Sequence, residues 1–165
     1  MSTDPRHIAK MVELIKATRM AMLITTCADG SLRGRPMATI ETDFDGDLWF
    51  FTDKDEPKVQ EILRHPLVNL SYADPKQQSY VSVSGEAGIV LDRAKIDQLW
   101  DPFFQAWFPQ GKSDPQIALI KVAVNQAEYW ETAPGPVVSL MGFVKAWTTG
   151  EAYQPGENEK VEVSA

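Results

Sequence analysis

Hydrophobic positions near the N-terminus follow a helical spacing that soon gives way to strand-like runs. Apolar residues recur every three or four positions over residues 8–18, after Asp4 as a candidate cap and Pro5 in the first turn. This pattern predicts an amphipathic helix with one buried face. Three short apolar runs separated by Asp-Gly turns follow, at residues 20–27, 32–41 and 48–52. Asp-Gly between such runs is typical of hairpins, so we expect an antiparallel meander of three strands.

The rest of the chain alternates short helices with further strands. Residues 55–65 predict a helix, because Asp55 is placed to cap it and Pro57 falls in its first turn. Two more helices are predicted, at residues 92–104 and 137–148. Four apolar or alternating runs predict strands, at residues 67–72, 79–91, 117–124 and 127–131.

Turns and glycines favour a barrel over an open sheet. The connections between strands are too short for parallel crossovers, so the strands pair antiparallel. Gly85 and Gly88 lie within one long strand and predict a bulge or sharp bend of the kind that barrels need. We expect a mainly β (α+β) fold, an antiparallel barrel of six to seven strands with short peripheral helices. One domain over residues 1–150 is expected, followed by a polar C-terminal tail over residues 151–165.

Composition narrows the function classes. The chain has 165 residues, a formal net charge of -7 and no run of Lys or Arg, which argues against binding to nucleic acid or anionic lipid. It has no run of about 18 apolar residues, so we expect no membrane span. Cys27 is the only cysteine, so no intrachain disulfide can form, and the N-terminal residues lack a signal-peptide core. A reducing cytoplasm is therefore the expected compartment.

Common catalytic and metal-binding patterns are missing from the sequence. The only two histidines, His7 and His65, have no neighbour at metal-ligand spacing, and one cysteine cannot complete a zinc site. No G-x-S-x-G elbow, Walker loop or G-x-G-x-x-G occurs. We therefore expect no metal site, and the sequence alone identifies no catalytic acid or base.

Residues 33–58 carry the most informative combination of side chains. Arg35 and Met37 lie on one expected strand, Thr52 ends the next strand, and Lys58 begins the helix that follows. A helix N-terminus attracts phosphate through its free amides and its dipole, and a lysine there adds a cation. An arginine pairs with phosphate through its planar fork. On these residues alone, a nucleotide-like site and a solvent-facing strand and helix explain the pattern equally well.

Five short segments occur in the order and spacing of a known family. They are residues 34–37 (GRPM), 48–52 (LWFFT), 57–59 (PKV), 80–85 (YVSVSG) and 127–130 (AEYW). Together they resemble the pyridoxamine 5′-phosphate oxidase-like flavoproteins, the FMN-binding split barrels, and within these the general stress protein 26 group. The resemblance implies a split β-barrel that binds FMN, with FAD as an alternative. It also implies a homodimer with the flavin at the subunit interface.

Nine residues would contact the flavin if the resemblance is carried over position by position. They are Arg35, Pro36, Met37, Phe51, Thr52, Lys54, Lys58, Tyr80 and Trp130. Lys58 would bind the phosphate with Lys54 as a helper, and Arg35 would face the phosphate or the polar side of the ring. Trp130 would reach the flavin from the second subunit, while a core or interface position explains this aromatic residue equally well.

Two departures from the family pattern bear on function. Pyridoxamine phosphate oxidases follow the matching Glu-Tyr-Trp with an Arg-x-His-type segment that binds the substrate phosphate. Residues 131–137 hold neither Arg nor His, and Glu131 would repel a dianion, which disfavours vitamin B6 oxidation. Glu56, directly before Pro57 and Lys58, would lower the positive potential of the phosphate site and weaken FMN retention.

Three functions remain open at this point. The leading hypothesis is an FMN-binding, general stress protein-like flavoprotein, either a flavin-dependent oxidoreductase of unknown substrate or a protein that binds FMN for storage or sensing. An alternative is a reductase that uses the deazaflavin F420 on a related barrel, which the acidic charge and the few cations disfavour. A third is a cofactor-free dimeric interaction protein.

Overall fold

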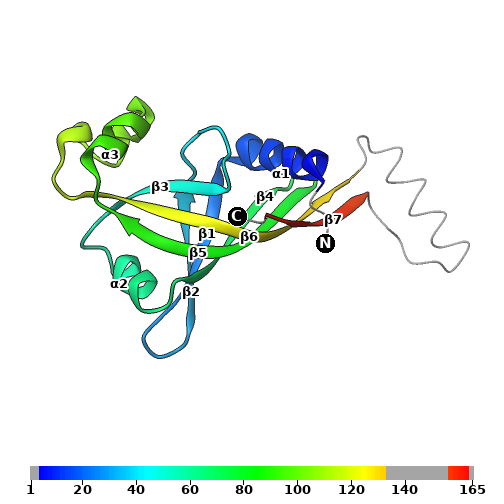
Figure 1. Ribbon diagram of the computed structural model, residues 1–165, viewed down its shortest axis with the longest axis horizontal. Helices are drawn as coiled ribbons and strands as arrows, with labels where there is room; N and C mark the ends of the chain where they lie inside the picture. The colour runs from blue at the N-terminus through cyan, green and yellow to red at the C-terminus, as the bar shows by residue number, and fades with distance from the viewer. Residues whose placement is uncertain (1–3, 133–155, 164–165) are drawn as a thin grey trace, which may run out of the picture.

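Residues 4–132 and 156–163, which the computed structural model describes, form one antiparallel sheet of seven strands with three α-helices around it (Figure 1). The helices are α1 (Pro5–Thr18), α2 (Pro57–Arg64) and α3 (Arg93–Leu99), and two 3-10 turns follow, η1 (Pro102–Ala106) and η2 (Gly111–Ser113). The strands are β1 (Met20–Thr26), β2 (Leu32–Ala38), β3 (Asp47–Asp53), β4 (Leu67–Asp74), β5 (Ser79–Val90), β6 (Ile117–Glu131) and β7 (Glu157–Glu162). The predicted α+β fold is confirmed.

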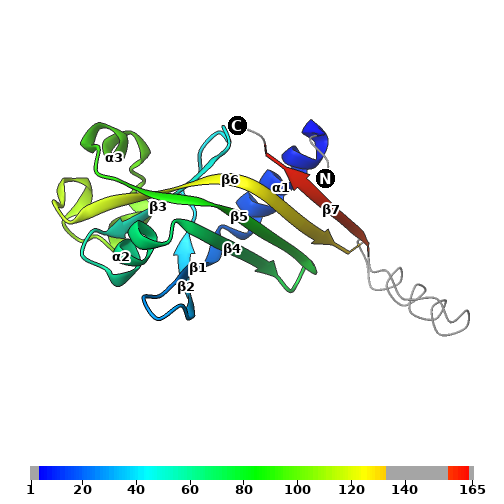
Figure 2. The ribbon, with the colours of Figure 1, turned by 60° about the horizontal axis from the view of Figure 1, so that its bottom comes forward.

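The long strand β6 organises one side of the sheet. The strand order is β2-β1-β4-β5-β6-β3, and β7 also pairs with β6. Residues 117–123 of β6 pair with β3, and residues 126–131 pair with β7, so two strands share one edge of β6 in succession. Figure 2 shows β5 and β6 running side by side across the molecule, with β7 beyond them. Among the described residues, β2 and β3 do not pair, so the sheet is not a closed ring.

The predicted meander of three consecutive strands is wrong, because β3 pairs with β6 and not with β2. The reason lies in the side chains of β3, which are buried on both faces of the strand. Leu48 and Phe50 enter the main core beneath α1, whereas Trp49 and Phe51 enter a second, smaller core near α3 and η1. Only a strand placed between two packed layers can bury both sets, and the turn sequence does not reveal this demand.

β6 is one continuous strand, not the two strands predicted at residues 117–124 and 127–131. The register between β5 and β6 shifts between Ser84 and Gly85, and Asn125 is the extra residue of a bulge. A bulge bends a strand without ending it, so the polar residues that suggested a break mark a bend instead.

Gly85 is required at this bulge. A side chain there would place its Cβ 2.4 Å from the carbonyl oxygen of Ala123, a distance that no real contact tolerates. The predicted bulge at Gly85 is confirmed. Gly88 differs, because it stays in regular register and a Cβ at that position would meet open space.

The predicted helix over residues 92–104 is divided into α3 and the turn η1. Asp101 precedes Pro102 and has an extended backbone, since the residue before a proline is sterically excluded from helical conformation. The Asp101 carboxylate then caps η1 by accepting the amide of Phe103 at 2.8 Å. No helix in the described part of the chain is both long and apolar enough to cross a lipid bilayer.

Part of the expected polar tail is a strand. Residues 157–162 form β7, and Val161 is fully buried in the main core. In the sequence, Val161 is a lone apolar residue among charged ones and does not by itself predict a strand. Pairing of β7 with β6 places it in the core. The predicted helix over residues 137–148 lies outside the described residues.

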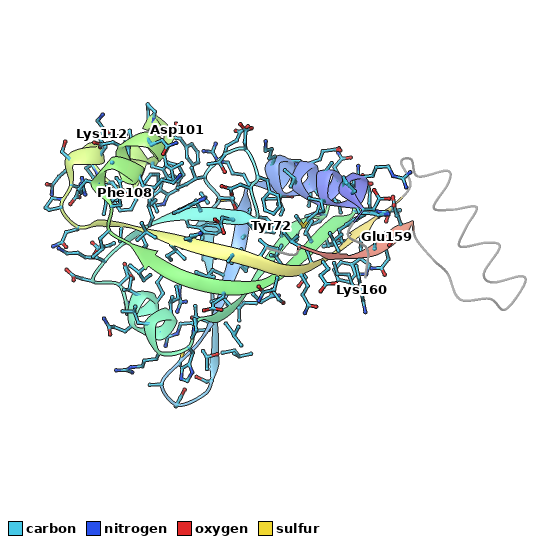
Figure 3. All side chains as sticks on the ribbon, in the orientation of Figure 1. Tyr72, Asp101, Phe108, Lys112, Glu159 and Lys160 are labelled. Atoms are coloured by element: carbon cyan, nitrogen blue, oxygen red, sulfur yellow. The ribbon has the colours of Figure 1, made fainter. Side chains whose placement is uncertain are left out.

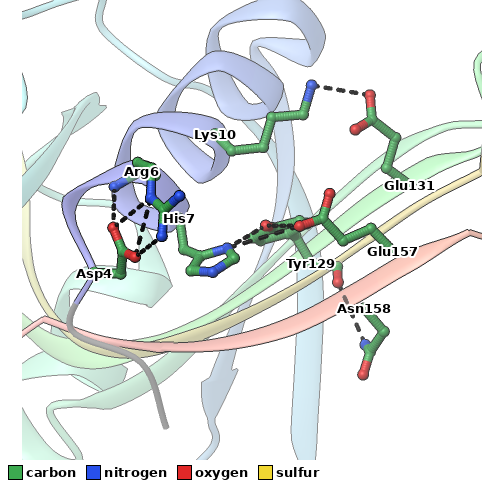
Figure 4. A network of polar contacts seen from close by, with 8 residues as sticks. All are labelled: Asp4, Arg6, His7, Lys10, Tyr129, Glu131, Glu157 and Asn158. Atoms are coloured by element: carbon green, nitrogen blue, oxygen red, sulfur yellow. Dashed lines mark hydrogen bonds and ion pairs between the residues drawn. The ribbon is translucent and has the colours of Figure 1, made fainter.

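A network of hydrogen bonds and ion pairs connects helix α1 with β6 and β7 (Figure 4). His7 Nδ1 lies 2.8 Å from the Tyr129 hydroxyl, which in turn donates to Glu157 at 3.1 Å. Lys10 forms an ion pair of 3.0 Å with Glu131. Burial, together with the carboxylate of Glu157 and its acidic neighbours, raises the pKa of Tyr129, so the hydroxyl stays a hydrogen-bond donor.

Candidate functional site

A cavity of about 340 Å³ lies where β2, β3 and α2 meet the segment that follows α3. Four of the nine predicted flavin residues line it: Pro36 and Met37 from β2, Phe51 from β3 and Lys58 from α2. Its volume lies in the range of small-molecule sites. The structure thus brings together the separate segments that the sequence singled out between residues 33 and 58.

Lys58 places its ammonium group in the wall of this cavity, with only 10% of its side chain exposed. Burial lowers the pKa of Lys58 from its ordinary value of 10.5, and repulsion from Arg35 adds to this, while Glu56 opposes it. The nearest carboxylate oxygen of Glu56 is 3.7 Å from the ammonium. An ammonium that is partly desolvated and weakly paired gains free energy when an anion binds beside it.

The N-terminus of α2 is open beside Lys58. Glu56 is the N-cap, where Asp55 was predicted, and its side chain makes no capping hydrogen bond. Pro57 at the first helical position sets the cap one residue later than expected, and the amide of Asp55 instead donates to Asp53 at 2.8 Å. Pro57 has no N–H and the Val59 amide donates to the Glu56 carbonyl at 3.0 Å, so the Lys58 amide is the one of these first three that an anion could bind.

Arg35 forms a partly buried triangle of hydrogen bonds with Thr25 and Glu61. Its guanidinium donates to the Thr25 hydroxyl and to Glu61 Oε2, each at 2.7 Å, and Thr25 donates to the same Glu61 oxygen at 2.6 Å. Burial opposes ionisation of Glu61, but the hydrogen bonds from Thr25 and Arg35 and the charge of Arg33 leave its pKa below the usual value. Arg35 is close enough to Lys58 to repel it, so these two predicted flavin contacts are neighbours. Nothing in the sequence pattern indicated a role for Glu61.

Thr52 and Lys54 lie beside the cavity without lining it. Thr52 is buried, and its hydroxyl donates to the backbone carbonyl of Asp53 at 3.2 Å. Lys54 is exposed, and its amide donates to the carbonyl of Gln116 at 2.8 Å, which ties the end of β3 to the start of β6.

Tyr80 and Trp130 lie on another part of the sheet and do not line the cavity. They are directly paired on β5 and β6, 42% and 39% exposed, and Trp130 is also paired with Asn158 of β7. Figure 3 shows Phe108, a cavity residue, at the α3 end of the molecule and Lys160 of β7 at the opposite end. One chain therefore does not bring Tyr80 and Trp130 to the cavity.

An aromatic wall that the sequence analysis missed completes the cavity. Phe104, Trp107 and Phe108, from η1 and the residues after it, line the cavity together with Phe51. The ring centroids of Phe51 and Phe104 are 4.8 Å apart in an edge-to-face arrangement, which aromatic pairs prefer. The sequence pattern predicts a helix with a buried face over residues 92–104. It carries no signal that this helix and the residues after it lie beside β3.

A second cluster gathers groups that could bind a metal ion. One ligand atom each from His7, Glu157 and Glu159 lie within 4.8 Å of one another. The sequence predicts no metal site, because β7 is brought to α1 only by the fold. His7 is engaged with the Tyr129 hydroxyl in the network described above, which explains these contacts as a link between α1 and β7.

The side chains that line the cavity offer apolar and cationic surfaces that a flavin nucleotide could contact. Pro36, Met37 and Phe51 offer an apolar surface for the ring system, and Lys58 at the start of α2 offers an ammonium and a backbone amide for the phosphate. Glu56 also lines the cavity and subtracts positive potential, as expected from the sequence. The residues present therefore fit a flavin.

The chain matches one family model over most of its length. The model is described as Pyridoxamine 5'-phosphate oxidase like, and it matches residues 6–154. Protein bli-3 of Neurospora crassa is 31% identical over 156 residues, which is 88% of this chain and 75% of that protein.

Two solved structures share the fold. A protein from Jannaschia sp. CCS1, described as a candidate general stress protein 26, has a TM-score of 0.76 and 25% identity, covering 97% of this chain and 100% of that chain. The general stress FMN/FAD binding protein of Xanthomonas citri has a TM-score of 0.67 and 31% identity, covering 76% of this chain and 89% of that one.

Proposed function

Because the chain belongs to the pyridoxamine 5'-phosphate oxidase like family, we propose that it is a flavoprotein that binds FMN in the cavity between β2, β3 and α2. The observation that carries the proposal is the ammonium of Lys58, partly desolvated in the cavity wall beside the uncapped start of α2. The similar Xanthomonas citri protein is an FMN/FAD binding protein, which supports the same class of ligand.

The residues of the chain divide the work of binding. The ammonium and backbone amide of Lys58 bind the phosphate, and Arg35, which Glu61 and Thr25 hold in place, adds a second positive charge nearby. Met37 and Phe51 exclude water from one side of the ring. A bound flavin supplies hydride or electron transfer, so the proposed activity is that of an oxidoreductase whose substrate is not yet identified.

The proposal includes a homodimer. Met20, Met22, Tyr80 and Trp130 are all exposed, and the strand registers place Met22, Tyr80 and Trp130 on the same outer face of the sheet. Large apolar side chains gathered on one face are typical of protein interfaces. Pairing of two such faces would cover them and let Tyr80 and Trp130 approach a flavin from the second subunit.

Vitamin B6 phosphate is not the proposed substrate. Glu131, which follows the matching Glu-Tyr-Trp, is held by Lys10 at 3.0 Å, so a carboxylate lies near the position where the oxidases have a phosphate-binding segment. A cytoplasmic location is part of the same proposal, since a chain with Cys27 as its only cysteine does not depend on an intrachain disulfide.

The test is the absorption spectrum of the purified protein, followed by titration with FMN, FAD and F420. We expect a saturable FMN complex and a dimer by light scattering. Lys58→Met should weaken FMN binding about tenfold or more, because a hydrogen bond to a charged group contributes about 1.5–3 kcal/mol. Lys76→Met, in the turn between β4 and β5 and outside the cavity, should leave the affinity unchanged. A protein that binds no flavin, or equal effects of the two substitutions, would contradict the proposal.

A further inference from the structure

The cavity has a wall that the proposed flavin contacts leave unused. Phe104, Trp107 and Phe108 line it from the segment between α3 and β6, and Asp114 of the same segment lines it as well. None of these residues belongs to the predicted flavin set. Trp107 is 56% exposed, so its large ring is open to a ligand and is not committed to the core.

Aromatic packing holds this wall in place. The Phe104 ring lies 4.8 Å from Phe51, and Phe108 lies 6.2 Å from Phe51, both edge to face. The guanidinium of Arg19 lies 3.8 Å above the ring of Phe103, and the centroid of that ring lies 5.2 Å from the Trp107 ring in a tilted arrangement. A surface that is already ordered loses little conformational entropy when a flat ligand binds to it.

The charges of the cavity select the sign of such a ligand. Asp53, Glu56 and Asp114 line the cavity, against the single ammonium of Lys58 among its described lining residues. Glu56 is the carboxylate nearest to Lys58, at 3.7 Å. Asp114 is only 8% exposed, and one of its carboxylate oxygens accepts a hydrogen bond from the Gln116 amide at 2.9 Å. A bound FMN phosphate would use Lys58 and leave the cavity more negative still.

We propose that the wall of Phe104, Trp107 and Phe108, with Asp114 beside it, binds a planar aromatic cation next to the flavin. This inference rests on the proposed function, because it takes the Lys58 side of the cavity as the flavin site. Aromatic faces attract cations through their quadrupole, and a partly buried carboxylate adds Coulombic attraction. An aromatic carboxylate or phosphate of the same size is repelled by the same groups.

Isothermal titration of the FMN-loaded protein with three bicyclic probes tests the proposal. The probes are N-methylquinolinium, which is cationic, quinoline, which is neutral at pH 7, and 2-naphthoate, which is anionic. We expect N-methylquinolinium to bind about tenfold or more tightly than 2-naphthoate, with quinoline between them. Trp107→Ala should weaken N-methylquinolinium binding about tenfold, whereas Trp107→Phe, which keeps a ring, should retain most of it. Asp114→Asn keeps the acceptor for the Gln116 amide and should reduce the preference for the cation.

Three results would overturn the proposal. One is equal affinity for N-methylquinolinium and 2-naphthoate, and another is equal binding to the Trp107→Ala variant and the unmodified protein. The third is release of FMN on addition of the cation, seen as a rise in free FMN fluorescence, which would assign the wall to the flavin site itself. If the protein binds no FMN, the flavin proposal fails separately, and the same probes titrated into flavin-free protein still test the wall.

Discussion

The ion pair between Arg35 and Glu61 should make a measurable contribution to folding stability. Both side chains are largely buried, at 17% and 11% exposed, and their nitrogen and oxygen are 2.7 Å apart. A hydrogen bond between charged groups contributes about 1.5–3 kcal/mol, and a partner left buried and alone loses at least that much. Glu61→Gln should therefore lower the free energy of unfolding by about 1.5–3 kcal/mol at neutral pH.

For a chain of this size, each kcal/mol shifts the melting temperature by about 2–4 °C, so the Glu61→Gln variant should melt roughly 3–12 °C lower. The pKa of Glu61 is lowered from its ordinary value of 4.5, so its contribution is fully present above that pH. It is lost as the pH falls through the lowered pKa of the folded state. The difference between the unmodified protein and Glu61→Gln should therefore shrink in acid.

Urea unfolding at one fixed protein concentration measures this contribution, because a dimer makes stability depend on concentration. A double-mutant cycle of Glu61→Gln with Arg35→Met isolates the pair. Arg33→Met is the matched control, since its nitrogen is 4.0 Å from Glu61 on a side chain that is 61% exposed. Exposed pairs contribute about 0–1 kcal/mol. Additive effects of Glu61→Gln and Arg35→Met, or a difference that does not change with pH, would refute the reasoning.

Further predictions concern Lys58, Gly85 and Tyr72. Because burial lowers the pKa of Lys58 below 10.5, FMN affinity should fall as the pH rises through that lowered pKa, and fluorescence titrations of Lys58→Met should show no such dependence. Burial of the charged ammonium destabilises the fold below the lowered pKa, and this cost is relieved as the pH rises towards 10.5. The free energy of unfolding of flavin-free protein, measured with urea, should therefore increase over the same pH range. Gly85→Ala should destabilise the protein by about 1–3 kcal/mol because its Cβ meets the Ala123 carbonyl, while Gly88→Ala should have little effect in the same assay. Tyr72→Phe removes the buried 2.8 Å hydrogen bond with Thr39 and should cost about 0.5–1.5 kcal/mol of unfolding free energy, and an unchanged melting temperature would show that this bond contributes nothing.

Local pattern was sufficient for most elements of this protein. Apolar and alternating runs located β1 to β6, with β6 predicted as two strands, helical spacing with a proline in the first turn located α1 and α2, and Gly85 marked the bulge between β5 and β6. These features depend on neighbours within a few residues, because side-chain direction repeats every two residues in a strand and every 3.6 in a helix. The three cavity segments carrying Met37, Phe51 and Lys58 were singled out through the resemblance of short ordered runs to a known family, whereas local pattern alone left a solvent-facing strand and helix equally open.

Tertiary structure decided everything that depends on distant partners. The pairing of β3 with β6, the docking of β7 through Val161 and the position of Phe104 beside Phe51 join residues far apart in the chain. The sequence assigned no role to Glu61, and only the fold brings it within 2.7 Å of Arg35 beside the site. Such contacts are selected by the burial of apolar surface and the pairing of buried charges over the whole molecule, and neither has a local signature.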